Sequence, residues 1–205
     1  MSKLILFQGD SVTDCDRSRE DLNDLGLGYP KFVAGFFNAR YPGEDVNFLN
    51  RGISGNRVRD LKARWANDCI ALKPDIVSIL IGINDTWRRY DEANDPTTAA
   101  EYESDYRYIL NEIKTKLPNT EIVMMEPFVL QSPPDRLIWR EDLDPKIHVV
   151  RKLAAEFGAT FIALDGIFAE ASIASYPEKW SADGVHPSPN GHALIAENWL
   201  NAMNF

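Results

Sequence analysis

The sequence predicts an α/β protein, a three-layer α/β/α sandwich in which helices cover both faces of a five-stranded parallel sheet. Two observations predict this fold. Five short runs rich in β-branched and aromatic residues recur along the 205 residues, and segments with helical spacing of apolar residues follow them. The runs are apolar along their whole length, which is typical of strands that are covered on both faces. Repeated alternation of strand and helix then favours parallel strands.

The expected elements can be assigned in chain order. The apolar runs predict strands at residues 4–7, 46–50, 76–81, 122–125 and 160–164. Apolar residues three or four positions apart predict helices over residues 58–72, 102–117, 147–157 and 193–203. Capping signals predict two helix starts, at Asp144 before Pro145 and at Ser188 before Pro189.

Length and composition favour a single domain, residues 1–205, because a chain of this size with 44% hydrophobic residues can bury one substantial core. The formal net charge of −9 disfavours binding to nucleic acid or to an anionic membrane surface. No apolar run reaches transmembrane length, and the first one is too short for a signal peptide. We therefore expect a cytoplasmic protein that binds a neutral small molecule or glycan. Cys15 and Cys69 are expected to be reduced, small buried residues.

Ser11 is the first candidate catalytic residue. The first predicted strand ends abruptly in Gly9-Asp10-Ser11, which delivers a hydroxyl to the edge of the sheet. A serine hydroxyl is a poor nucleophile at neutral pH unless a base takes its proton. Near the other end of the chain, Asp183 and His186 are three residues apart, so the carboxylate can hold one ring nitrogen while the other faces Ser11. The three residues predict a catalytic triad.

Two further residues are candidates for stabilising an oxyanion. Gly55 follows the second predicted strand and Asn84 follows the third. Sites in parallel sheets lie beyond the carboxyl ends of the strands, where Ser11 is also expected. Taken singly, each residue also has a purely structural interpretation: Gly55 would form a tight turn, and Asn84 would be a loop residue whose side chain bonds to its own backbone. Together, the Ser11 and Gly55 amides and the Asn84 side chain predict a three-donor oxyanion hole.

The motifs occur in the order Gly9-Asp10-Ser11, Gly55, Gly82-Ile83-Asn84-Asp85 and Asp183-Gly184-Val185-His186-Pro187. In this order they resemble the SGNH hydrolases, also called GDSL esterases and lipases, from the first strand to the last helix. The resemblance implies a flavodoxin-like fold, a triad of Ser11, His186 and Asp183, and an oxyanion hole of Ser11, Gly55 and Asn84. It implies no metal and no organic cofactor. Val12 replaces the leucine that usually follows the serine, a change expected to affect packing rather than chemistry.

The segments between the motifs suggest a narrower resemblance. Residues 10–15, 25–29, 52–65 and 81–90 look like the corresponding parts of bacterial intracellular acetyl-xylooligosaccharide esterases. This resemblance implies deacetylation of short plant-cell-wall sugars. Trp180 departs from it, because it stands three residues before Asp183, whereas those esterases are expected to carry an adjacent tryptophan. No substrate contact is therefore assigned to Trp180.

Other polar residues near the motifs receive supporting roles. Asp10 and Asp85 are expected to be hydrogen-bond acceptors that order the two loops. His148 and His192 lie on helical patterns and are expected to be surface or core histidines. In the basic string that contains Arg57, Arg59, Lys62 and Arg64, only Arg57 is close enough to Gly55 in sequence to be a candidate substrate contact.

Specificity is expected to come from two long connections, residues 86–96 and 127–142. Their aromatic residues Trp87, Tyr90 and Trp139 are the further candidate substrate contacts. An aromatic face can stack on a sugar, on an acyl chain or on a neighbouring subunit. The sequence is therefore also compatible with a homo-oligomer. Three functions follow: a carbohydrate acetylesterase, a lysophospholipase or thioesterase for longer acyl groups, and a non-catalytic binding module. The complete triad disfavours the last, and the acidic surface without a long apolar lid disfavours bulk lipid.

Overall fold

The computed structural model describes residues 2–205 and contains one five-stranded parallel sheet with the strand order β2-β1-β3-β4-β5. The strands are β1 Lys3–Gly9, β2 Val46–Asn50, β3 Ile76–Leu80, β4 Glu121–Met125 and β5 Thr160–Ile162. The register pairs Phe7 with Asn50 and Gly9 with Leu80, so the segments that follow β1, β2 and β3 leave the sheet at the same edge. The predicted flavodoxin-like sheet is confirmed.

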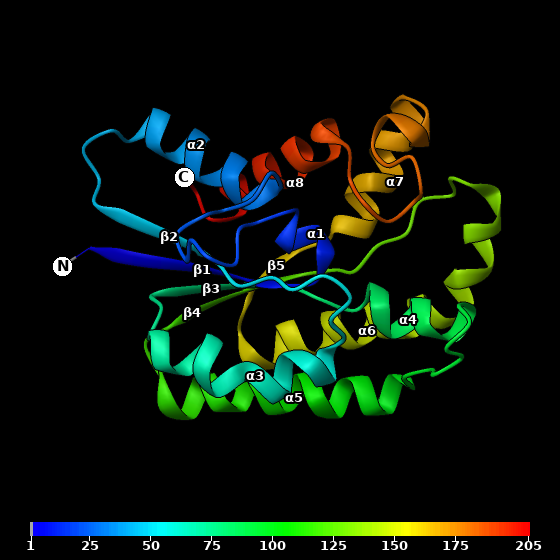
Figure 1. Cartoon of the computed structure of the whole chain (residues 1–205), viewed down its shortest axis with the longest axis horizontal. Coiled ribbons are helices and arrows are strands. Elements are labelled where there is room, and N and C mark those ends of the chain that lie inside the picture. Colours follow the sequence, from blue (N-terminus) through cyan, green and yellow to red (C-terminus); the bar gives the residue numbers. More distant parts are fainter. Residues whose placement is uncertain (1) are drawn as a thin grey trace.

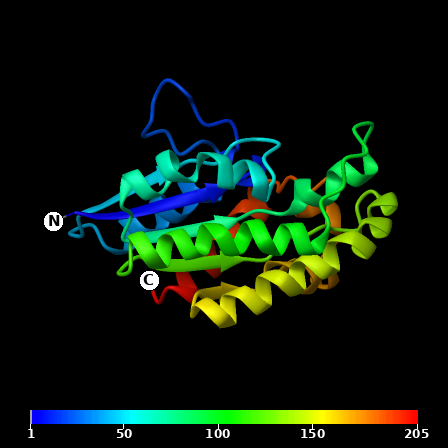
Figure 2. The ribbon, with the colours of Figure 1, turned by 90° about the horizontal axis from the view of Figure 1, so that it is seen from below.

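Helices cover both faces of this sheet (Figure 1). One layer contains α2 Tyr29–Arg40, α7 Leu164–Ala174 and α8 Pro189–Ala202, and the other contains α3 Val58–Asp68, α5 Ala99–Lys116 and α6 Arg140–Phe157. Figure 2 shows α3, α5 and α6 side by side across the second face. Two short helices, α1 Ser11–Asp14 and α4 Ile83–Tyr90, follow β1 and β3 directly, and 3₁₀ turns occupy Ile70–Leu72, Pro134–Trp139 and Pro177–Lys179.

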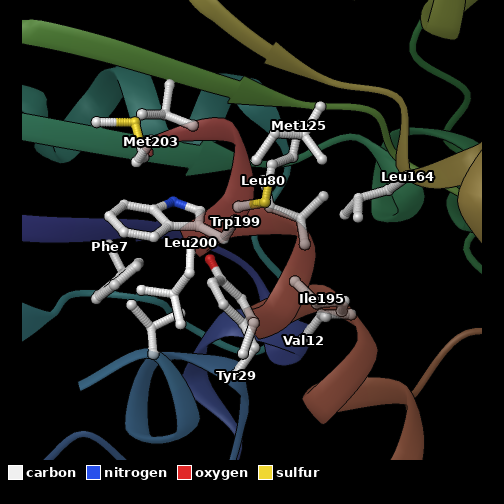
Figure 3. Packing of buried hydrophobic residues seen from close by; sticks show 14 of the residues in the cluster. Phe7, Val12, Tyr29, Leu80, Met125, Leu164, Ile195, Trp199, Leu200 and Met203 are labelled. Carbon is white, nitrogen blue, oxygen red and sulfur yellow. The ribbon is translucent and has the colours of Figure 1, made fainter. Parts of the chain in front are cut away.

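Each helical layer packs against one face of the sheet and forms a separate hydrophobic core with it. Beneath α2 and α8, the rings of Phe7 and Tyr29 and those of Phe7 and Trp199 have centroids 5.6 Å apart (Figure 3). The indole of Trp199 also donates a hydrogen bond to Ser78 Oγ at 2.9 Å, which satisfies its one polar atom inside the core. On the other face, Trp65 of α3 and Tyr106 of α5 are almost completely buried with Leu6 and Ile79 of the sheet. The two cores fix the strand ends that carry the site.

Several element boundaries differ from the sequence predictions. Helix α6 begins at Arg140, so Pro145 lies inside it, and Asp144 forms an ion pair with Arg140 instead of capping a helix start. Trp139, Leu143 and Ile147 are buried together at a spacing of four residues, and this apolar stripe extends the helix by more than a turn before the proline. Leu164 begins α7 rather than ending β5. Ser188 does cap α8, as predicted, and accepts a hydrogen bond from the Gly191 amide.

The first of the two expected long connections, residues 86–96, begins inside a helix. Trp87 and Tyr90 lie on α4, which is separated from β3 by only two residues, and not on an extended loop. The sequence patterns did not predict helices α2, α4 and α7. In α2 and α7 apolar residues occur all around the helix and few charged residues mark an outer face. Helix α4 does separate its apolar residues from its charged ones, but this pattern covers only eight residues. The second connection contains the 3₁₀ turn Pro134–Trp139 and the start of α6.

Candidate active site

Ser11 occupies the first position of α1, directly after β1. The carboxylate of Asp10 caps this helix, since its Oδ1 accepts a hydrogen bond from the Val12 amide at 3.0 Å. Burial raises the pKa of Asp10 to about 7, against the lowering effect of that amide and of the nearby His186. The cap fixes the backbone on both sides of Ser11, which agrees with the expected ordering role of Asp10.

Ser11, His186 and Asp183 form a continuous line of hydrogen bonds. Ser11 Oγ lies 2.9 Å from His186 Nε2, and His186 Nδ1 lies 2.6 Å from Asp183 Oδ2. The other carboxylate oxygen, Asp183 Oδ1, accepts hydrogen bonds from the amides of Val185 and His186 and from Ser181 Oγ. Residues from the two ends of the chain therefore meet in the order serine, histidine and aspartate, which is the geometry that a nucleophile, its base and an orienting carboxylate require.

The pKa values of this line suit proton transfer. The hydrogen bond that His186 Nδ1 donates to Asp183 raises the pKa of His186 above its ordinary value, although partial burial opposes the shift. Burial would raise the pKa of Asp183, but the hydrogen bonds from the His186 side chain and from the His186 and Val185 amides outweigh it and lower that pKa strongly. Asp183 therefore stays ionised, and in this position its carboxylate can stabilise a protonated His186 imidazole.

Gly184 allows the turn between Asp183 and His186. Its φ is +82°, in the left-handed region, and a Cβ there would lie 2.5 Å from the carbonyl oxygen of Ser132. The Leu130 amide donates to the Gly184 carbonyl, so the turn packs directly against the segment that follows β4. On the same side, Arg136 Nε donates to the Asp183 carbonyl at 3.1 Å. The Asp183–His186 turn is thus held from outside as well as by its own hydrogen bonds.

The expected oxyanion donors follow β2 and β3 at the sheet edge where Ser11 lies. Gly55 has a φ of +82°, which only glycine adopts readily, and it lies in the loop between β2 and α3. Asn84 is buried at the start of α4, and its Nδ2 donates to the Asn56 carbonyl at 3.1 Å. An amide nitrogen carries two hydrogens, so one stays available for an oxyanion.

A groove of about 280 Å³, with both polar and apolar side chains in its lining, borders Ser11 and His186. The side chains that line it are those of Ser11, Val12, Cys15, Asp16, Ser54, His186, Pro187 and His192. Of the two environments expected for His192, surface or core, the structure shows the core: the residue is buried, and its Nδ1 accepts a hydrogen bond from the Tyr29 amide at 3.1 Å. Burial lowers its pKa to about 4, so it is neutral and presents Nε2–H toward Cys15 Sγ, 3.5 Å away.

Cys15 is only half-buried and lines this groove, so the expectation that both cysteines are buried holds only for Cys69. Sequence reasoning also missed Asp16, Ser54 and His192 as groove residues. Asp16 lies only five residues after Ser11, so its place near the site could have been inferred from the sequence. His192 lies at the start of α8, and no sequence pattern predicts that this helix start is close to α1.

The aromatic candidates form one cluster beside His186. The ring of Trp87 lies 5.9 Å from the imidazole of His186 and 5.2 Å from Trp139, and Tyr90 stacks on Trp139 with the planes 6° apart. The guanidinium of Arg136 lies 4.4 Å from the centroid of Trp139, which is only 4% exposed. Trp139 is therefore a packing residue, and Trp87 is the member of the cluster next to His186.

The remaining sequence candidates are engaged elsewhere. Arg57 forms ion pairs with Asp95 and Asp60, and only 12% of its side chain is exposed. Trp180 donates its indole N–H to the Ala171 carbonyl and packs toward α7. His148 is exposed on α6. Within residues 2–205, no three His, Cys, Asp or Glu side chains are grouped so that they could hold a metal ion. No helix in the same range is both long and apolar enough to cross a bilayer.

Comparisons with known proteins agree with this geometry. The model of the GDSL-like lipase/acylhydrolase family matches residues 7–194. The chain is 39% identical to an acetylxylan esterase of Geobacillus stearothermophilus over 208 residues, which cover 98% of this chain and 94% of that enzyme. A crystal structure of an acetylxylan esterase from the same organism has a TM-score of 0.89 at 39% identity, covering 99% of this chain and 94% of that one. A protein described as a GDSL-like lipase from Parabacteroides merdae has a TM-score of 0.92 at 39% identity, covering 100% and 97%.

Proposed function

The chain belongs to the GDSL-like lipase/acylhydrolase family and is an SGNH-type carboxylic ester hydrolase, and we propose that it deacetylates short carbohydrates such as acetylated xylooligosaccharides. The observation that carries the proposal is the hydrogen-bonded line from Ser11 through His186 to Asp183. The similarity to an acetylxylan esterase over nearly the whole chain supports acetyl esters of sugars as the substrate class.

In the proposed reaction, Ser11 Oγ attacks the acetyl carbonyl carbon while His186 Nε2 takes the hydroxyl proton. The bond to the sugar oxygen then breaks, and His186 returns the proton to that oxygen, which leaves an acetyl group on Ser11. Water repeats the sequence and releases acetate. Asp183 keeps Nδ1 protonated throughout, because its carboxylate accepts the hydrogen bond from that nitrogen at 2.6 Å.

The tetrahedral intermediates carry a negative charge on the former carbonyl oxygen. We assign its stabilisation to the amides of Ser11 and Gly55 and to the free hydrogen of Asn84 Nδ2. These donors come from three segments that leave the sheet at one edge, so they are fixed before the substrate arrives.

The groove beside Ser11 and His186 is the proposed site of the sugar leaving group. The leaving oxygen must lie close to His186 Nε2 to receive its proton, and His186 and Ser11 both line the groove. The other groove residues include the exposed side chains of Asp16 and Ser54, which can hydrogen-bond to sugar hydroxyls. A lysophospholipase or thioesterase with longer acyl groups stays the alternative function, because Val12, Cys15 and Pro187 give the groove an apolar part as well.

A chain-length series tests the proposal. Hydrolysis of p-nitrophenyl esters is measured from acetyl to octanoyl, beside release of acetate from acetylated xylobiose. We expect the rate to fall steeply as the acyl chain lengthens, and we expect acetate from the sugar. Rising activity toward octanoyl without acetate release would favour a lipid or thioester substrate. A folded protein that is inactive toward every ester would instead support a binding module.

A further inference from the structure

Asp14 lies at the end of α1, three residues after Ser11, and takes no part in the triad. Its carboxylate is buried, with 3% of the residue exposed, yet it bonds to the loop that carries Gly55. Oδ2 accepts hydrogen bonds from both the amide and the hydroxyl of Ser54, each at 2.8 Å. Ser54 directly precedes Gly55, so the short helix of the nucleophile is tied to the residue before an oxyanion donor.

Two arginines stabilise the buried carboxylate of Asp14. Arg19 Nη2 bonds to Asp14 Oδ2, and Arg17 Nε lies 3.8 Å from Oδ1. A buried carboxylate without such partners would be strongly destabilising. Both arginines also donate to the carbonyl of Gly52 at 3.0 Å. The network therefore holds the loop at residues 52 and 54, just before Gly55.

The other side of Gly55 is held from α4. Asn84 Nδ2 donates to the Asn56 carbonyl, and Asp85 Oδ2 accepts a hydrogen bond from the Val58 amide at 3.0 Å. This contact agrees with the ordering role that the sequence predicts for Asp85. Ser54 is exposed and Gly55 and Asn56 are only partly buried, so hydrophobic packing alone does not fix this segment.

We propose that Asp14 is a positioning residue of the esterase, which aims the Gly55 amide at the oxyanion by holding Ser54 against α1. The inference rests on the proposed function, because it assumes that Gly55 donates to an oxyanion. Oxyanion donors act only when they are fixed within a fraction of an ångström of the developing charge. A carboxylate that accepts two charge-assisted hydrogen bonds from one residue supplies that rigidity.

The test compares Asp14→Ala with Glu101→Ala as a matched control. Glu101 also accepts hydrogen bonds from the amide and hydroxyl of one residue, Thr98, but it does so at the start of α5, outside the site. Two quantities are measured: the kcat and KM for p-nitrophenyl acetate, and the affinity for a trifluoromethyl ketone. Addition of Ser11 Oγ to the ketone carbon, with the proton passing to His186, places an oxyanion in the hole. Thermal melting establishes that each variant is folded.

We expect Asp14→Ala to lower kcat and ketone affinity by a similar factor, about 10- to 100-fold, with little change in KM. Glu101→Ala should change neither. Asp14→Asn keeps the volume and one acceptor oxygen, so it should fold even where alanine does not, and should lose about 3- to 10-fold in both quantities. Wild-type values of kcat and ketone affinity in a folded Asp14 variant, or a loss confined to KM, would overturn the proposal.

Ser11→Ala separates this proposal from the proposed function. If Ser11→Ala abolishes turnover while the Asp14 variants behave as wild type, only the role of Asp14 is wrong. If the wild-type protein neither hydrolyses the acetyl ester nor binds the ketone, the proposed function fails and the role of Asp14 fails with it.

Discussion

Arg136 donates a hydrogen bond from Nε to the backbone carbonyl of Asp183, at 3.1 Å, across 47 positions of sequence. The same guanidinium lies over the ring of Trp139, and its Cγ faces Gly184. The side chain is 17% exposed, so most of it is buried between the aromatic cluster and the catalytic turn. The segment after β4 therefore supports the Asp183–His186 turn from outside.

Arg136→Ala should lower kcat about 10-fold, because it removes the donor that holds the Asp183 carbonyl and loosens the alignment of His186. Arg136→Lys should not restore the rate, since an ammonium group cannot both stack on Trp139 and donate in the guanidinium plane. Arg40→Ala is the control, because Arg40 also donates to a backbone carbonyl, that of Phe205, away from the site. Equal rates for the Arg136 and Arg40 variants would contradict this role.

Asp183→Asn should shift the pH dependence of kcat/KM. His186 must be neutral to act as the base, and its pKa is raised, so the wild-type rate should rise with pH through a value above the ordinary 6.5. Removing the carboxylate lowers that pKa and moves the acidic limb to lower pH. The plateau should also fall, by up to about 10,000-fold, because the imidazolium loses its stabilising charge. An acidic limb that stays in place would show that another group controls it.

Asn84→Ala should lower kcat about 100- to 1,000-fold with a much smaller change in KM, because the lost donor acts mainly in the transition state. Asn84→Asp keeps the size and should be at least as damaging, since it places an acceptor where a donor is needed. Steady-state kinetics with p-nitrophenyl acetate measures both. A variant that changes KM alone would make Asn84 a contact to the bound substrate.

Trp87→Ala should raise KM for acetylated xylobiose more than KM for p-nitrophenyl acetate, if its ring offers a face to the sugar beside His186. Trp139→Ala is a useful contrast. Trp139 is 4% exposed, so its loss should instead lower the free energy of unfolding by about 3–5 kcal/mol. Equal KM changes on both esters would remove Trp87 from sugar binding.

Ser11, Gly55 and Asn84 could be placed at one edge from the sequence because each follows a predicted strand, and parallel strands bring their carboxyl ends together. Asp14 and Arg136 could not be found in that way. Their contacts join loops distant in sequence through hydrogen bonds to Ser54 and Asp183, which leave no periodic pattern. The predicted start of α6 was wrong because the Asp144–Pro145 signal outweighed the apolar spacing of residues 139, 143 and 147.

The nucleophilic role of Ser11 is tested most directly by following acetate release from acetylated xylobiose by NMR, for the wild-type protein and for Ser11→Ala. We expect acetate from the wild type only, with the variant folded, because the Ser11 hydroxyl alone is lost. In the same samples, a serine-directed phosphonate should label Ser11 of the wild type and no residue of the variant. Acetate release by Ser11→Ala at a rate close to that of the wild type would contradict the assignment of Ser11 as the nucleophile.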